Sequence, residues 1–170
     1  MMIDTKYATM MARYDRWQNQ SLILAADQLT DAERWQDRGV FFRSIAETLN
    51  HILWDHRVWL HRQRNDLASA QELGARHPYT DAPRDWEVYK QERAQLDHEI
   101  RDWCDGLSDR DLEAPVTWMR GDVLVETEFG FNLVHMFNHA THHRGQVHGL
   151  LTAAGIDPGS TDLPMLPDTV

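Results

Sequence analysis

Histidines at helical spacing are the residues of this chain whose types and positions favour a specific chemistry. The chain has 10 His among 170 residues, and at about 100° per residue several of them form one polar band on a predicted helix over residues 131–154. This band holds His135, His139, His142, His143 and Gln146. His139 and His143 are four positions apart, so their side chains lie on the same side of a helix, one turn from each other. Two imidazoles at this spacing can bind one metal ion.

The same pair lacks the carboxylate that a zinc peptidase needs. In the H-E-x-x-H motif, the Glu that acts as general base follows the first His, whereas Ala140 follows His139 here. The spacing alone therefore allows two interpretations. One is a metal site, and the other is a polar stripe of solvated or mutually hydrogen-bonded imidazoles.

A metal site needs a third ligand from another helix. A predicted helix over residues 44–64 offers His51, His56 and His61. On its helical wheel His56 lies at the centre of the apolar stripe and His51 lies well off it, so periodicity favours His56 as the inward residue. A single buried His is more often a hydrogen-bonded core residue than a ligand. The pattern alone leaves the third ligand open.

Four long segments with helical periodicity must position these histidines. They cover approximately residues 3–29, 44–64, 83–107 and 131–154, with turn-rich stretches between them. Their amphipathic patterns predict an all-α fold, a four-helix bundle. The connections, of about 14–25 residues, exceed the roughly 2–8 residues usual in bundles, and this length permits topologies other than up-down-up-down.

Local signals refine this prediction. Ser44 followed by Glu47 has the pattern of a capping box, Pro83 is expected in the first turn of the third helix, and Gly106 near its end. Alternating apolar residues around Gly121 predict a short hairpin-like excursion within residues 114–129, between the third and fourth helices. The chain is expected to form a single domain over residues 1–170, with its core at about 3–155 and an extended C-terminal tail at 156–170.

Composition excludes several classes of function. The chain has 17 Lys+Arg against 27 Asp+Glu and a formal net charge of −10, which argues against binding to nucleic acid or to an anionic membrane surface. The single cysteine, Cys104, cannot form a disulfide within the chain and is expected to be a small core residue. We see no signal peptide and no apolar run near the about 20 residues of a membrane helix. Together these features predict a cytoplasmic protein.

Three stretches of the sequence resemble a known family. The sequence FFRSIAETLNHIL at residues 41–53, followed by RVWL at 57–60, resembles the second helix of the DinB/YfiT-like proteins. These are damage-inducible proteins, distinct from the DNA polymerase that shares the DinB name. LVHMFNHATHHRGQ at 133–146 is similar to the family's most recognisable signature, and ARYDRWQN at 12–19 looks like its usual opening. The resemblance spans about residues 10–155.

The resemblance implies a four-helix bundle, often a homodimer, that holds a divalent metal ion such as zinc or nickel through three histidines. The pattern maps these ligands to His51, His139 and His143, which differs from the choice of His56 on the helical wheel. A bundle helix that contacts two neighbours can bury two faces, which allows both residues to face inward. Near relatives often carry an acid where this chain has His56, and Asp55 could serve in place of that acid.

Three neutral imidazoles with an open position are the pattern of a catalytic metal site. Such a metal could lower the pKa of a bound water toward about 7 or bind a thiolate, and no catalytic side chain is evident. Ligating histidines usually donate their second N–H to another group, for which Asp55, His135 and Gln146 are the candidates. We expect His142 to be an ordinary surface residue.

The resemblance also suggests an activity. Some members of the wider superfamily are transferases or isomerases that use low-molecular-weight thiols. We therefore expect a metal-dependent enzyme acting on a small molecule, either a thiol-dependent S-transferase or a hydrolase. The alternative is a non-catalytic metal-binding protein with a structural or stress-response role, also dimeric.

Overall fold

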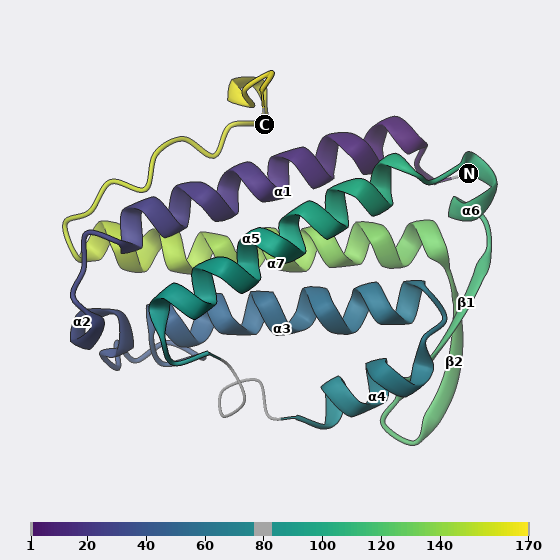
Figure 1. Ribbon diagram of the computed structural model, residues 1–170, viewed down its shortest axis with the longest axis horizontal. Helices are drawn as coiled ribbons and strands as arrows, with labels where there is room; N and C mark the ends of the chain where they lie inside the picture. Colours follow the sequence, from purple (N-terminus) through teal and green to yellow (C-terminus); the bar gives the residue numbers. More distant parts are fainter. Residues whose placement is uncertain (1, 77–82, 170) are drawn as a thin grey trace.

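Four long helices lie side by side along the longest axis of the molecule (Figure 1). A computed structural model describes residues 2–76 and 83–169. The long helices are α1 (Thr5–Ala26), α3 (Ile45–Gln63), α5 (Trp86–Asp105) and α7 (Phe129–Ala153). The predicted all-α bundle is confirmed. No helix in the described part of the chain is both long enough and apolar enough to cross a membrane.

The bundle does not have up-down-up-down topology. Figure 1 shows that α1 and α7 run in one direction while α3 and α5 run in the other. Helix α1 packs against both α5 and α7, and α3 packs against α7. The neighbours α1 and α7 are therefore parallel, and α3 and α7 are antiparallel. The consecutive long helices α3 and α5 run in the same direction (Figure 1), so the chain between them must return along the bundle, which requires a long connection.

Short elements fill these connections. They are helices α2 (Asp31–Trp35), α4 (Leu67–Ala75) and α6 (Asp109–Leu112), and the C-terminal tail holds the 3₁₀ helix η1 (Leu163–Met165). None of these was predicted, because each spans too few turns to show periodicity. The predicted hairpin is present as β1 (Pro115–Arg120) and β2 (Val123–Glu128), paired antiparallel, with Gly121 at a positive φ of 60° in the turn. Glycine adopts this conformation at little cost.

Capping residues fix where the long helices begin. Ser44 is the N-cap of α3, as predicted, since its hydroxyl accepts the backbone N–H of Glu47 at 3.1 Å and donates to the Glu47 carboxylate at 2.8 Å. The prediction for Pro83 was wrong, because α5 starts three residues later. Its N-cap is Asp85, whose carboxylate accepts the backbone N–H groups of Glu87 and Val88. Gly106 is the C-cap of α5, as expected.

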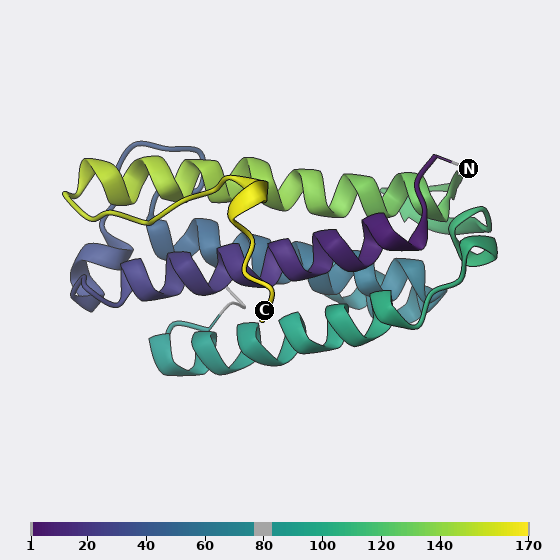
Figure 2. The same cartoon turned by 90° about the horizontal axis from the view of Figure 1, so that it is seen from above.

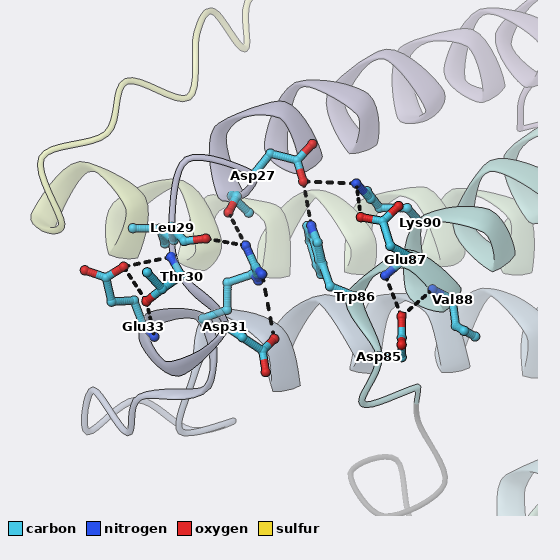
Figure 3. Close-up of polar contacts among 12 residues, drawn as sticks. Asp27, Leu29, Thr30, Asp31, Glu33, Asp85, Trp86, Glu87, Val88 and Lys90 are labelled. Carbon is cyan, nitrogen blue, oxygen red and sulfur yellow. Dashed lines mark hydrogen bonds and ion pairs between the residues drawn. The ribbon is translucent and has the colours of Figure 1, made fainter.

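Polar contacts lock the start of α5 to the end of α1 (Figure 3). The indole of Trp86 donates to the Asp27 carboxylate at 2.6 Å, and the ammonium of Lys90 donates to the same oxygen at 3.2 Å. Arg34 of α2 donates to the backbone carbonyls of Ala26, at 3.0 Å, and Leu29. Helix α2 is thus tied to the C-terminal end of α1 and to the turn that follows it.

The C-terminal tail lies along the outside of the bundle, beside α1 and α7 (Figure 2). Side chains of α1 hold it through its backbone carbonyls: Tyr14 donates to Thr161 at 2.7 Å and Gln18 donates to Ser160 at 3.0 Å. The tail is largely irregular, as expected, apart from η1.

Candidate metal centre

Three histidine rings from two helices converge inside the bundle. His51 comes from α3, and His139 and His143 come from successive turns of α7. The Nε2 atom of His139 lies 3.5 Å from Nε2 of His51 and 3.1 Å from Nε2 of His143. One ring nitrogen of each residue lies within 4.8 Å of the other two. Because α3 and α7 are antiparallel neighbours, residues 88 positions apart meet here.

Acceptor atoms close to Nδ1 assign the ring protons of two of these histidines. Nδ1 of His143 lies 2.8 Å from Oε1 of Gln146, and Nδ1 of His139 lies 3.0 Å from Oδ2 of Asp55. Both partners are acceptors, so each Nδ1 carries the proton and each Nε2 presents a lone pair to the centre. The contact with Asp55 is at ion-pair distance but lacks the alignment of a good hydrogen bond.

Burial favours the uncharged form of the imidazoles in this site. Burial lowers the pKa of His51 to about 4, against the opposing effect of Asp55. Burial also lowers the pKa of His143, although its contact with Gln146 opposes this. Burial alone would raise the pKa of Asp55, but its contact with His139 and the nearby imidazoles outweigh burial and lower it. At neutral pH the rings of His51 and His143 are therefore uncharged and lie near the carboxylate of Asp55, a combination that attracts a cation.

The geometry fits a transition-metal ion. Tetrahedral zinc with Zn–N distances of about 2.0–2.1 Å separates its ligand nitrogens by about 3.3 Å, and the two measured separations of 3.1 and 3.5 Å bracket that value. Lone pairs held this close repel each other unless a proton or a cation lies between them. An imidazole set also suits zinc and nickel better than magnesium or calcium, which prefer oxygen ligands.

An aromatic side chain covers one side of the three rings. Phe42 is buried and stacks on His51, with ring centroids 4.0 Å apart and planes 23° apart, and its edge meets His143 at 5.0 Å. A tight turn places it there: the backbone N–H of Arg43 donates to the carbonyl of Val40 at 2.8 Å, and Arg43 has a φ of 65°. Few residues other than glycine adopt this backbone conformation. Sequence reasoning missed Phe42, because the turn has no glycine to mark it.

His56 belongs to a different cluster, as a hydrogen-bonded core residue. It is fully buried, as its helical wheel predicted, and its Nδ1 lies 3.1 Å from a guanidinium nitrogen of Arg93 and 3.7 Å from Asp15. The helical wheel was nevertheless wrong as a guide to the convergent ring, which is His51. Helix α3 packs against α7 and also contacts α5, and it buries both histidines.

The cluster around His56 joins all four long helices. Asp15 pairs with Arg144, and Arg93 pairs with Asp97 at 2.8 Å. Asn19 bridges the two carboxylates, at 3.0 and 2.8 Å. Two carboxylates and two guanidinium groups thus balance each other in the interior, which makes the burial of these charges tolerable.

The other residues considered from the sequence lie outside the three-ring group. His135 is exposed, with its ring 5.6 Å from that of His139. His142 is exposed, as expected, and contacts Gln146 at 3.2 Å, while His61 pairs with Asp66 at 3.0 Å. Cys104 is buried, and burial raises the pKa of its thiol to about 12, so it is no nucleophile.

Comparison with known families agrees with this geometry. The profile of the DinB family matches residues 2–169, nearly the whole chain. The chain belongs to the DinB family. No curated protein matches it. Among solved structures, this DinB protein resembles a DinB-like protein from Bacillus cereus ATCC 10987 with a TM-score of 0.62 and 19% sequence identity. The match covers 85% of this chain and 90% of that one, and it shows a shared fold.

Proposed function

We propose that this DinB protein is a metal-dependent enzyme that acts on a small molecule, with His51, His139 and His143 as the ligands of a zinc or nickel ion. The observation that carries the proposal is the convergence of one nitrogen from each of three imidazole rings. In two of these rings, those of His139 and His143, the other nitrogen faces an acceptor. In the part of the chain that the structure describes, no fourth His, Cys, Asp or Glu joins this group. Three protein ligands are typical of catalytic zinc sites, whereas structural sites have four.

The metal would supply Lewis acidity, which lowers the pKa of a water or thiol and stabilises negative charge. The chain's own residues do the rest. Asp55 and Gln146 keep the Nδ1 protons of His139 and His143 in place and so fix the direction of the ligand lone pairs. Phe42 excludes water from the side of His51. The His139 side chain keeps 25% of its surface exposed, so a substrate can approach there.

The class of reaction follows from what the site lacks as well as from what it holds. The buried Cys104 cannot attack a substrate, which favours a nucleophile from outside the chain. We propose a low-molecular-weight thiol or water in this role, which corresponds to an S-transferase or a hydrolase. The net charge of −10 favours a small-molecule partner over nucleic acid or a membrane. We further propose a cytoplasmic homodimer.

The test is elemental analysis of the purified protein, followed by a screen of thiols with electrophilic substrates on the metal-loaded form. We expect about one equivalent of metal per chain and turnover that disappears with metal removal. Equal turnover by metal-stripped and metal-loaded protein contradicts the proposal. Metal that stabilises the fold without any turnover or thiol binding favours a non-catalytic metal-binding protein instead.

A further inference from the structure

A stripe of four residues extends from the metal centre along α3. His51, Asp55, Trp59 and Arg62 follow one another at intervals of four, four and three residues, which places them on one face of the helix. The first two residues contribute to the metal centre. Along the helix axis Trp59 lies about 6 Å and Arg62 about 10 Å beyond Asp55, since an α-helix rises 1.5 Å per residue.

Two tryptophans hold the guanidinium of Arg62. Its central carbon lies 4.6 Å from the ring centroid of Trp59 and 4.6 Å from that of Trp118. The two indoles meet edge to face, at 5.2 Å and 65°. Trp118 is itself fixed, because its indole N–H donates to Thr127 at 3.0 Å. Cation–π contact with two fixed rings orients a guanidinium but leaves its N–H donors free.

The other arginines of this helix region have carboxylate partners, and Arg62 does not. Arg57 pairs with Glu92 at 3.1 Å, and Arg64 pairs with Glu99 at 2.5 Å. In the described part of the chain, no carboxylate lies within ion-pair distance of Arg62, although its side chain is half-buried. The charge of Asp55 raises the pKa of Arg62, but the Asp55 carboxylate is already in contact with His139.

Ring contacts connect Arg62 to the metal centre. The ring of His135 lies 5.6 Å from that of His139 and 4.8 Å from that of Trp59. Arg62 also lines a pocket of about 290 Å³ between α4 and the hairpin, and no residue of the metal centre lines this pocket. Asp122 also lines this pocket, but it is exposed and forms no ion pair with Arg62. A ligand can therefore meet the guanidinium without displacing a protein carboxylate.

We propose that Arg62, oriented by Trp59 and Trp118, binds the anionic group of the substrate whose reacting end lies at the metal centre. The anion is a carboxylate or a phosphate, because the planar fork of a guanidinium matches both. This inference rests on the proposed function and adds a substrate class to it: a small acid whose anionic group lies about 10–16 Å from its reacting atom, the rise of α3 from Asp55 and from His51 to Arg62.

The first experiment tests the anion site without any metal. Metal-free, ¹⁵N-labelled protein is titrated with glutarate and with inorganic phosphate while the indole N–H signals of Trp59 and Trp118 are followed. We expect saturable shifts of both signals, and a weakening of about 10- to 100-fold in Arg62→Gln, since hydrogen bonds to charged groups contribute roughly 1.5–3 kcal/mol each. Arg64→Gln, which changes an arginine two positions away, should bind the anions as the wild type does.

Arg62→Lys keeps the positive charge and provides a second test of the anion site in case Arg62→Gln does not fold. It should bind anions more weakly than the wild type but more tightly than Arg62→Gln, since the fork is lost and the charge remains. A response to only one of the two anions identifies that group and supports the proposal. Absence of saturable shifts, or shifts that persist unchanged in both Arg62 variants, overturns it.

The second experiment tests the link to the metal. Cobalt-loaded protein is titrated with ω-mercaptocarboxylates of increasing chain length and with the matching ω-mercaptoalcohols, and thiolate binding is followed by its charge-transfer absorption. We expect the acids to bind at least about 10-fold tighter than the alcohols at one chain length, and Arg62→Gln to abolish this preference. Thiols that bind without any preference for the acid overturn the substrate class but leave the metal centre intact. Anion binding without thiol binding contradicts the S-transferase form of the proposed enzyme and leaves the anion site standing.

Discussion

Nδ1 of His139 lies 3.0 Å from Oδ2 of Asp55, and Asp55 lies one helical turn after His51 on α3. One helix thus provides both a convergent imidazole and the carboxylate that orients an imidazole from the facing helix. The carboxylate also adds negative charge beside the three ring nitrogens.

Asp55→Asn should weaken metal binding by about 10- to 100-fold with little change in the fold, as is typical when the partner of a ligating histidine is lost. The measurement is competition for zinc with a chromophoric chelator. Asp102→Asn is the matched control, because Asp102 also faces a histidine, His98, at 3.3 Å, but on the surface of α5. Equal zinc affinity of the wild type and Asp55→Asn would show that this carboxylate does not act on the metal.

His139→Ala should lose more affinity for metal than Asp55→Asn does, because the variant removes a ligand and also the contact with Asp55. Helix content should stay unchanged, since the ring is only partly buried. Elemental analysis and circular dichroism check the two expectations. His98→Ala removes an exposed histidine as the control. A His139→Ala protein that still purifies with one equivalent of metal would exclude His139 as a ligand.

Phe42→Ala should make a bound metal more accessible, because the ring that stacks on His51 is removed. We expect faster removal of zinc by a chelator and a loss of about 3–5 kcal/mol in the free energy of unfolding. Phe41→Ala is the neighbouring control, since Phe41 is 81% exposed whereas Phe42 is 5% exposed. Identical removal rates in the two variants would contradict the covering role.

Asp15→Ala should lower the free energy of unfolding by about 3–5 kcal/mol, because it leaves the buried guanidinium of Arg144 without its carboxylate partner. Urea unfolding of the metal-free protein measures this loss. Asp31→Ala breaks an ion pair with Arg34 in which the Asp31 side chain is 67% exposed, and it should cost no more than about 1 kcal/mol. Similar losses in both variants would mean that the buried cluster adds little stability.

Acid should destabilise the protein through His56. Burial lowers the pKa of His56 from 6.5 to about 4, with Asp15 opposing and Arg93 adding to the effect. Between these two values the unfolded chain binds a proton that the folded chain does not, so the free energy of unfolding falls as pH drops from about 6.5 toward 4, by up to about 3 kcal/mol. Asp97 acts in the opposite sense, because burial raises its pKa to about 6 and its proton is held by the folded state.

His56→Gln should therefore become more stable relative to the wild type as the pH is lowered, since the variant keeps Asp97 and loses the imidazole. Urea unfolding at pH 7.5, 6 and 5 in the presence of a chelator measures the difference. A difference that stays constant over this range would rule out His56 as the source of acid sensitivity.

Periodicity was sufficient to predict the long helices and the hairpin, because each long helix has enough turns for its apolar stripe to be recognised. It was insufficient for α2, α4 and α6. Their starts are set by single capping residues, such as Thr30, whose hydroxyl accepts the backbone N–H of Glu33. Capping patterns that short occur often in loops, so they do not identify a helix by themselves.

The sequence pattern likewise predicted only part of the candidate site. The i, i+4 spacing of His139 and His143 was visible in the sequence, because both lie on one helix. The partner on the other helix was not, since a helical wheel asks which face is most apolar and α3 buries two faces. The helical wheel favoured His56, which lies among charged core residues, whereas His51 is the residue that lies at the metal centre. Only the family resemblance pointed to His51.

The 88-residue separation between His51 and His139 has a consequence for the lifetime of the protein. An ion bound by both would act as a clasp between segments from opposite halves of the chain, and it would favour only the folded state. Opening of α3 away from α7, which exposes backbone to proteases, would then become rarer as the ion becomes more available. The abundance of this protein in a cell would follow its metal supply, independently of any reaction that it catalyses.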